Sequence, residues 1–358
     1  MIRFSRFVLV VGITGGLLLT ILTTASPASA AKCLLLSSFD DYVCGNETAP
    51  LQFETPNPPA DTLFGKRNYA RLADNANVYP QPTRTVAPIR NVGDGYLFVT
   101  VNRWFENEAG ETWYEINYGE FVYEDDIQLA EPSDFQGVVV RWQPRRPFGW
   151  VVQDVVPSPA PDAEPALSAP ELSRYTFVEI YEVVLGKDGW LWYDIGNSQW
   201  VKQSYFSLVD VSPRPEGVGE NEHWAEIDLY EQTLAAYEGD RMVYATLISS
   251  GLNRWPTREG LFQVFDRFYE YKMSGAEGRI DYYFIEDIPY IMYFDEWIGA
   301  ALHGTFWHDR FGYKHSHGCV NMPIRDAEWT FNWSANAPND LWVWVHTSDP
   351  NDHLGQAP

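Results

Sequence analysis

The feature of this sequence that most constrains its fold is an internal repeat with an offset of 79 residues and no gaps. The first copy covers residues 66–130 and the second covers residues 145–210. A repeat at a fixed period indicates that one supersecondary unit is formed twice. The identical positions are mostly aromatic or β-branched: Tyr96, Phe98, Val99, Gly110, Trp113, Tyr114, Ile116 and Val122 recur as Tyr175, Phe177, Val178, Gly189, Trp192, Tyr193, Ile195 and Val201.

Both copies predict a series of short β-strands. Tyr96–Val101 and its counterpart Tyr175–Ile180 are rich in aromatic and β-branched residues, which favour strands. The turn residues Glu108–Gly110 and Lys187–Gly189 each precede a Trp-Tyr-x-Ile strand. We therefore expect two small β-barrels of about 65 residues each.

Composition and charge narrow the class of protein. Hydrophobic residues make up 45% of the 358 residues and charged residues 21%, which supports a packed core rather than global disorder. The 49 acidic and 25 basic residues give a net charge of −24. A chain this acidic repels phosphate backbones, so nucleic-acid binding is excluded. The 15 tryptophans suit short-stranded β modules or surfaces that stack on sugars.

The first thirty residues have the pattern of a secretory signal peptide. Arg3 and Arg6 precede the apolar stretch 7–22, and Ala28-Ser29-Ala30 has the small-x-small form of a cleavage site. The alternative is a retained membrane anchor, although the apolar stretch is short for a span. We expect cleavage after residue 30, no stable membrane insertion afterwards, and export to the cell wall, the periplasm or the extracellular space.

The chain has three cysteines, Cys33, Cys44 and Cys319. In an oxidising compartment, Cys33 and Cys44 are expected to pair within an N-terminal segment, residues 31–65. The alternative is two separate thiols. Cys319 is then unpaired, and such a cysteine is either buried and inert or reactive.

The remaining segments divide the chain further. Residues 130–145 connect the two copies. Residues 211–222 are rich in proline, glycine and charge and are expected to form a linker. A separate C-terminal domain is expected over residues 223–347, followed by a tail, residues 348–358.

The C-terminal domain is predicted to be mostly β with one helix. The helix is expected over Pro323–Trp333, since Pro323 suits a first helical position and Asp326 supplies an acid in the first turn. Three of the expected strands are Val243–Ile248, Leu261–Phe265 and Leu341–Val345.

Residues 303–321, HGTFWHDRFGYKHSHGCVN, hold four of the seven histidines and the unpaired cysteine. In one interpretation an imidazole removes the thiol proton of Cys319, and Gly318 permits a turn whose backbone N–H groups stabilise an oxyanion. A second interpretation is a metal site, but no HExxH or CxxC spacing is present. In a third, the histidines and the cysteine are structural.

The motif Ser316-His317-Gly318-Cys319-Val320-Asn321 resembles the signature of the L,D-transpeptidase (YkuD) catalytic domain, S/T-H-G-C-x-N/R. His303-Gly304 stands where that family has its first histidine. The element Thr257-x-x-Gly260-x-Phe262 is similar to the family's T-P-x-G-x-F, with Arg258 in place of the proline. The resemblance covers roughly a third of the chain.

The two repeat copies resemble bacterial SH3-like modules in their glycine turn, their Trp-Tyr strand and their final aromatic-Val strand. Exposed aromatic residues on such modules could hold glycan or peptide. The alternative is that most of these aromatics are core residues. The fold expected from both resemblances is mainly β, with two small SH3-like barrels before a β-rich catalytic domain.

The resemblance implies a reaction on bacterial cell-wall peptides. The cysteine attacks the carbonyl of the third residue of a tetrapeptide stem, a diamino acid, and the terminal D-alanine leaves. An amine of another stem then takes the acyl group, giving a 3→3 cross-link. The expected partners are donor and acceptor stem peptides, and no cofactor or metal is expected. Alternatives are an L,D-carboxypeptidase or amidase on the same scaffold, and a wall-binding protein without catalysis.

Carried over by residue, the resemblance makes Cys319 the nucleophile and His303 the general base. His317 would position the loop or the substrate carbonyl. The Cys319 N–H, with Gly318 nearby, would form the oxyanion hole. Some members of the family have a serine after the first histidine; here Gly304 stands there, so a backbone carbonyl would orient the ring.

Two further roles follow from the resemblance. Ser316 and Asn321 would brace the catalytic turn by hydrogen bonds. The aromatic stretch between residues 266 and 297 could be a mobile lid over the substrate or an ordinary hairpin with core aromatics. Candidates for substrate contact at the lid are Tyr290, Tyr293, Trp307 and Arg254.

Overall fold

The computed structural model describes two compact units, one within residues 1–50 and the other within residues 51–358. The residues described are 32–35, 42–45, 52–56, 63–166, 168–276, 278 and 281–349. The expected signal peptide, residues 1–30, and most of the expected tail, residues 348–358, lie outside this set. Within it, no helix has the length and apolar character needed to span a membrane.

The first unit contains one described hairpin. Strand β1 (Lys32–Leu35) pairs antiparallel with β2 (Tyr42–Gly45), and the register sets Cys33 opposite Cys44. Directly opposed residues in antiparallel strands have Cα separations compatible with a disulfide. The side chains of both strands lie outside the described part of the structure, so the disulfide stays a prediction.

The first large sheet of the second unit lies mostly in the C-terminal domain. Seven of the described strands form it, and β19 and β27 are its parallel pair. The alternating apolar residues of Leu341–His346 are buried, as the sequence pattern predicts. In sheet order the strands are β22 (Gly260–Gln263), β27 (Leu341–His346), β19 (His223–Asp228), β20 (Thr233–Glu238), β21 (Arg241–Leu247), β12 (Val138–Val140) and β3 (Phe53–Glu54).

The second large sheet joins the C-terminal domain to the first repeat copy. Strand β7 of that copy pairs in parallel with β24, and β25 pairs in parallel with β26. A further strand, β23, forms a long hairpin with β24. The strands are β11 (Ile127–Ala130), β4 (Asn68–Leu72), β7 (Tyr96–Val101), β24 (Tyr283–Asp295), β25 (Ala300–Thr305), β26 (Val320–Pro323) and β23 (Asp266–Gly275).

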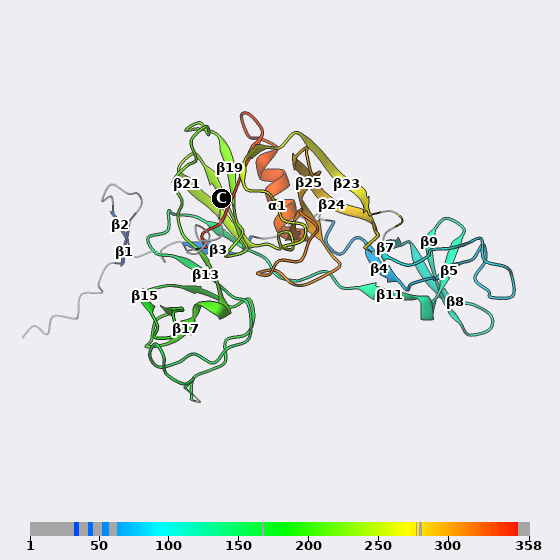
Figure 1. Ribbon diagram of the computed structural model, residues 1–358, viewed down its shortest axis with the longest axis horizontal. Helices are drawn as coiled ribbons and strands as arrows, with labels where there is room; N and C mark the ends of the chain where they lie inside the picture. The colour runs from blue at the N-terminus through cyan, green and yellow to red at the C-terminus, as the bar shows by residue number, and fades with distance from the viewer. Residues whose placement is uncertain are drawn as a thin grey trace, which may run out of the picture. The chain divides into compact units, whose positions relative to one another are not determined.

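Helix α1 (Ile324–Ser334) follows β26 directly and packs against β24 and β25. Figure 1 shows it between the strands β19 and β21 on one side and the strands β23 to β25 on the other. The prediction of a helix here is confirmed, starting one residue later than expected. Asp326 is the acid of the first turn, as predicted. It is also fully buried and accepts hydrogen bonds from the Tyr244 hydroxyl at 2.6 Å and the Gly137 N–H at 3.0 Å.

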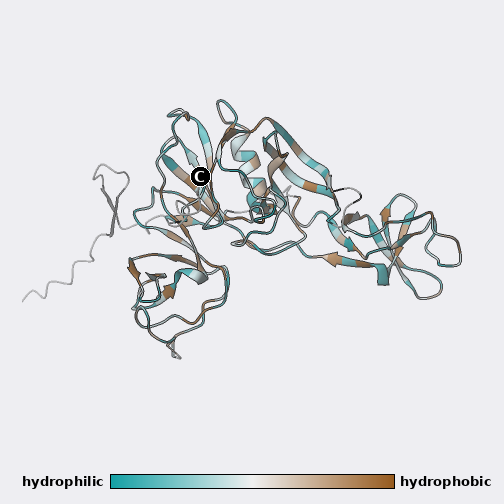
Figure 2. Cartoon of the chain, viewed as in Figure 1, coloured by the Kyte–Doolittle hydropathy of each residue, from teal (hydrophilic) through white to brown (hydrophobic). Residues whose placement is uncertain are grey.

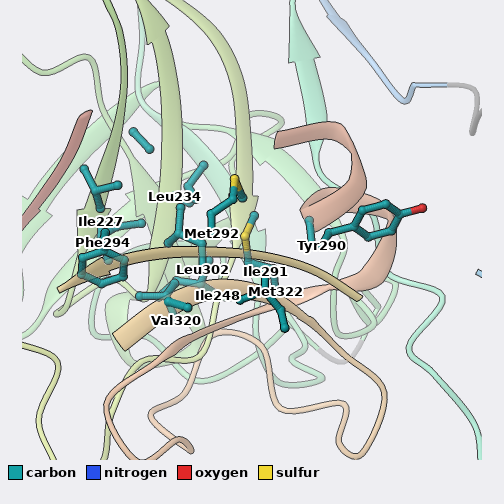
Figure 3. Close-up of a cluster of buried hydrophobic side chains, with 14 of the residues drawn as sticks. Ile227, Leu234, Ile248, Tyr290, Ile291, Met292, Phe294, Leu302, Val320 and Met322 are labelled. Atoms are coloured by element: carbon teal, nitrogen blue, oxygen red, sulfur yellow. The ribbon is translucent and has the colours of Figure 1, made fainter. Parts of the chain in front are cut away.

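The largest hydrophobic core lies between the two sheets and the helix. Figure 3 shows its side chains converging from strands that are far apart in sequence. Figure 2 shows hydrophobic segments on the strands, as expected for sheets that pack on each other. The labelled members are Ile227, Leu234, Ile248, Tyr290, Ile291, Met292, Phe294, Leu302, Val320 and Met322.

The two repeat copies have matching elements, each displaced by about 79 residues. The first copy adds a small pair, β5 (Asn77–Val78) with β6 (Arg90–Asn91). The strands β4, β7, β8 (Arg103–Glu106), β9 (Thr112–Asn117), β10 (Glu120–Tyr123) and β11 correspond to β13 (Phe148–Val151), β14 (Phe177–Glu179), β15 (Glu182–Leu185), β16 (Leu191–Asp194), β17 (Trp200–Lys202) and β18 (Phe206–Val209). The short 3-10 turns Glu124–Asp126 and Gln203–Tyr205 also correspond.

The copies are β units, but SH3-like barrels are not confirmed. In each copy three strands form a small sheet, β8–β9–β10 or β15–β16–β17. Strands β4, β7 and β11 of the first copy belong to a large sheet, whereas the corresponding strands of the second form the separate sheet β14–β13–β18. A half-barrel is thus what each copy presents.

Two stretches expected to be connectors also pack onto the first large sheet. Residues 130–145 contain β12, which pairs with β21. Gly137 permits this approach, because a Cβ there would lie 2.2 Å from the Ala245 carbonyl oxygen. Within residues 211–222, Val218 is buried and the Ser212 N–H donates to the Tyr237 hydroxyl at 3.1 Å.

Candidate active site

A pocket of about 560 Å³ contains the residues that the sequence singles out for chemistry. A larger hollow, about 820 Å³, lies along residues 211–218 and Asp240 and has no cysteine or histidine in its lining. Residues lining the first pocket include Tyr96, Leu252, Arg254, Met273, Asp281, Tyr282, Tyr283, Ile285, Ile288, Ile298, His303, Trp307, His315, Ser316, His317, Cys319 and Asn321.

Two parallel strands bring Cys319 and His303 into this pocket. The register of β25 and β26 pairs Leu302 with Val320 and His303 with Asn321. Cys319 directly precedes β26, and side chains alternate between the faces of a sheet. Cys319 and His303 therefore lie diagonally across adjacent strands on the same face.

His303 is buried, with its ring held in one tautomer. Nδ1 lies 3.0 Å from the Gly304 carbonyl oxygen, which can only accept a hydrogen bond. Nδ1 therefore carries the proton and Nε2 is able to accept one. The expected backbone carbonyl is that of Gly304 itself. A side chain at Gly304 would clash, because its Cβ would lie 2.8 Å from Pro289 Cγ.

Burial keeps both reactive groups neutral. It lowers the pKa of His303 to about 4 and raises the pKa of the Cys319 thiol to about 11. A hydrogen bond with the backbone of Ala301 partly offsets the effect on the thiol. At neutral pH the pocket therefore contains a neutral thiol and a neutral imidazole.

The turn before the thiol is fixed by two hydroxyl side chains. Ser316 Oγ accepts from the Gly318 N–H at 3.1 Å and donates to the Cys319 carbonyl. Thr257 Oγ1 donates to the Gly318 carbonyl at 2.9 Å. Gly318 has φ +116°, a conformation that favours glycine. Since Ser316 occupies the Gly318 N–H, the Cys319 N–H is the candidate oxyanion donor.

Asn321 makes a different contact from the expected one. Its side-chain amide lies 2.9 Å from Nε2 of His308 rather than on the turn. His308 is mostly covered, and burial holds its pKa well below the ordinary value. Sequence reasoning weighed His308 only as a metal ligand. Among the described residues, no group of three His, Cys, Asp or Glu side chains is arranged to hold a metal ion.

His317 and Arg254 lie at the mouth of the pocket. The exposed His317 ring stands 3.8 Å from the Trp255 ring and 5.5 Å from the Tyr283 ring. The Arg254 guanidinium lies over the Trp255 ring, 3.8 Å from the centre of that ring. A cation and two aromatic surfaces therefore border the entrance.

The hairpin β23–β24 has two roles. Met273, Tyr283 and Ile285 line the pocket, as a lid would. Tyr290 does not: it is fully buried, accepts a hydrogen bond from the Leu63 N–H at 3.1 Å, and points away from the neighbouring core side chains in Figure 3. Tyr293 packs against Phe265 and Phe268 and is also absent from the lining.

Tyr96 is a pocket residue that sequence reasoning missed. Tyr96 lines the pocket although it belongs to the first repeat copy. More than two hundred residues separate it from Cys319 in the sequence. The repeat marks Tyr96 as the counterpart of Tyr175, but nothing local predicts that β7 pairs with β24. Arg258, at the place of the family's proline, forms a salt bridge with Asp295 at 3.0 Å.

Known proteins are similar to the C-terminal region of this chain. The YkuD family, described as the L,D-transpeptidase catalytic domain, matches residues 222–345. A curated relative, the putative L,D-transpeptidase YciB of Bacillus subtilis (strain 168), is 27% identical over 128 residues, which are 30% of this chain and 59% of that protein. The chain thus spans about three fifths of that relative.

Two solved structures are among the proteins that the chain is similar to. An NMR structure of the catalytic domain of the Enterococcus faecium L,D-transpeptidase is 26% identical and covers 36% of this chain and 100% of that one, with a TM-score of 0.31. A crystal structure of a mutant of the Enterococcus faecium enzyme is 25% identical, covering 35% of this chain and 50% of that one, with a TM-score of 0.31. Residues 222–345 of this protein are thus similar to the YkuD-type L,D-transpeptidase catalytic domain.

Proposed function

We propose that the protein is an exported peptidoglycan L,D-transpeptidase that uses Cys319 as its nucleophile. One observation carries the proposal: Cys319 directly precedes β26, His303 lies on the adjacent parallel strand β25, and both line one pocket of about 560 Å³. The pocket is bordered by aromatic side chains and a cation, which suit a peptide that carries carboxylates.

The first half-reaction forms a thioester. His303 Nε2 takes the thiol proton while the sulfur attacks the carbonyl of the third, diamino-acid residue of a tetrapeptide stem. The Cys319 N–H stabilises the oxyanion. The tetrahedral intermediate collapses, the bond to the terminal D-alanine breaks, and His303 returns the proton to the leaving amine.

The second half-reaction transfers the acyl group. An amine of another stem attacks the thioester, and His303 removes a proton from that amine. The carbon–sulfur bond breaks, the thiol is restored, and a 3→3 cross-link is released. Water in place of the amine gives a tripeptide, which is the carboxypeptidase alternative. The general-base contribution is worth roughly 10²–10⁴-fold in rate.

The experiment that tests this proposal compares the wild type with Cys319→Ala. A carbapenem should add one adduct to the wild type and none to the variant, measured by intact mass. A disaccharide-tetrapeptide should then be converted to a cross-linked dimer with release of D-alanine. A folded, reduced wild type that forms neither the adduct nor any peptide product would sink the proposal, and tripeptide alone would favour the carboxypeptidase.

The proposal includes wall targeting by the repeat copies as SH3-like modules. Large aromatic side chains are exposed on them, with Trp104 66% and Trp190 42% exposed. Such rings can stack on sugars or peptide. Trp104→Ala should reduce co-sedimentation with purified peptidoglycan, and retention equal to that of the wild type would argue against targeting through this ring.

A further inference from the structure

The two repeat copies hold the two ends of one short segment beside the catalytic residues. We call residues 306–313 the catalytic loop, because it follows strand β25, which carries His303, and precedes the turn that carries Cys319. Both of its ends contact the repeat copies rather than only the C-terminal domain.

The first copy holds the beginning of the loop. The Tyr69 ring stacks on Phe306, with centroids 3.6 Å apart and planes 6° apart. The Tyr96 hydroxyl donates to the Trp307 carbonyl at 3.4 Å. The Tyr96 backbone N–H donates to the Tyr282 carbonyl at 2.9 Å. The pairing of β7 with β24 therefore fixes the position of the Tyr96 ring.

The second copy holds the end of the loop. The Tyr175 hydroxyl donates to Asp309 Oδ1 at 2.7 Å. Arg174 reaches the same carboxylate at 3.3 Å and the Phe311 carbonyl at 3.2 Å. Tyr313 returns a hydrogen bond to the Val152 carbonyl of this copy at 3.3 Å.

The two contacts flank a residue that touches the catalytic strands. Tyr96 bonds Trp307 and Tyr175 bonds Asp309, which leaves His308 between them. The His308 ring lies 2.9 Å from the amide of Asn321, and Asn321 is the register partner of the base on β25. A shift of the loop would therefore reach the strand pair that sets the geometry of the base and the nucleophile.

We propose that Tyr96 and Tyr175, which occupy equivalent positions in the repeat, are positioning residues for acyl transfer: together they hold the catalytic loop on either side of His308. This inference rests on the proposed function above. The two copies are then parts of the catalytic machinery, because a displacement of about 1 Å in a supporting residue can cost on the order of 10²-fold in rate.

The first experiment compares Tyr→Phe variants, which keep the ring and remove one hydroxyl. Tyr175→Phe should lower kcat about tenfold with KM within about twofold, since it loses a hydrogen bond to a carboxylate. Tyr96→Phe should lower kcat about threefold, because its 3.4 Å hydrogen bond is weaker. Tyr118→Phe, at a side chain that is 99% exposed, is the control and should match the wild type.

A double-mutant cycle with Asp309 separates positioning from general stability. If Tyr175 acts through Asp309, adding Tyr175→Phe to Asp309→Ala should change kcat by less than about twofold. Asp309→Asn keeps an acceptor oxygen and should recover most of the loss. Additive losses, or values for Tyr175→Phe within twofold of the wild type in a folded protein, would overturn the proposal.

Alkylation of Cys319 by iodoacetamide needs no peptide substrate. It therefore tests the positioning role of Tyr175 separately from the proposed transpeptidase function. Slower alkylation in Tyr175→Phe than in Tyr118→Phe supports positioning even where the wild type fails to turn over a tetrapeptide. Normal turnover in the wild type, with equal kcat, KM and alkylation rate in Tyr175→Phe, leaves the transpeptidase standing and rejects positioning.

Discussion

The two repeat copies share their strands but join the C-terminal domain in different ways. The first copy joins edge to edge: β7 pairs with β24, and Tyr282 and Phe284 of the catalytic segment pack into the core of the copy. The second copy joins face to face: β14 pairs only with β13 among the described strands, and Phe148 and Trp150 pack with residues of the large sheet. One pattern therefore supports two kinds of interface.

The role of a strand in this protein therefore depends on whether its edge or its face contacts the C-terminal domain. Edge pairing lets the first copy place Tyr96 in the pocket wall. Face packing lets the second copy support the loop from outside, through Tyr175 and Asp309. Four matched changes test this contrast, and the one with the largest expected effect comes first.

The equivalent phenylalanines Phe98 and Phe177 test how deeply each copy is built into the protein. Phe98 is buried in the main core, whereas Phe177 is only partly buried. Phe98→Ala should lower the free energy of unfolding by about 3–5 kcal/mol, the usual cost of such a cavity, and Phe177→Ala by less than half of that. Urea denaturation measures both, and equal losses would contradict the contrast.

Glu231 tests whether the second interface depends on pH. It accepts a hydrogen bond from the Leu208 N–H of the second copy at 2.8 Å, and burial raises its pKa to about 8. A carboxyl whose folded pKa lies above its unfolded pKa contributes stability below pH 4.5 that is lost as the pH rises to about 8. Within this window the loss is about 1.4 kcal/mol for each pH unit.

Glu231→Gln should flatten this pH dependence of stability. Thermal unfolding measured between pH 5 and pH 9 tests this. Glu216→Gln, at an exposed position, is the matched control and should behave as the wild type. A slope that persists in Glu231→Gln would assign the pH dependence to another group.

Tyr96 and Tyr175 should differ in their effect on the thiol. Burial raises the pKa of Cys319 to about 11, and Tyr96 lines its pocket whereas Tyr175 does not. Tyr96→Ala admits water and should lower that pKa by about one unit, or about 1.4 kcal/mol. The midpoint of the alkylation rate against pH measures the shift, and Tyr175→Phe should leave the midpoint in place. An equal shift in both variants would remove the distinction.

The smallest effect is expected from the equivalent arginines Arg67 and Arg146. Arg67 forms two hydrogen bonds with Glu270 of strand β23, at 3.1 and 3.0 Å. Arg146 instead lies over the Tyr181 ring of its own copy, 4.6 Å from the ring centre. Arg67→Ala should cost about 0.5 kcal/mol, because the pair is partly exposed, and Arg146→Ala less. Chemical denaturation with tight error limits tests this, and a larger loss from Arg146→Ala would reverse the order.

Local patterns in the sequence carried much of the fold. The repeat, its turns and the helix after the cysteine motif could be predicted, because aromatic alternation, glycine turns and a proline start act over a few residues. The pairing of β12 with β21 could not, because nothing near Gly137 indicates that another backbone lies beside it. Tyr290 was misplaced for the same reason: spacing marks it as aromatic but not which way it faces.

The sequence by itself determined the chemistry of this protein: a thiol, an imidazole and the glycine turn between them are specified by one short motif and one upstream histidine. Only the tertiary structure decided the surroundings of that chemistry. It turned a repeat copy into a pocket wall, placed Tyr96 beside the catalytic loop and put the Cys319 thiol where burial raises its pKa. The physical reason is that sheet pairing joins residues regardless of their distance in sequence, whereas a motif acts through neighbours along the chain.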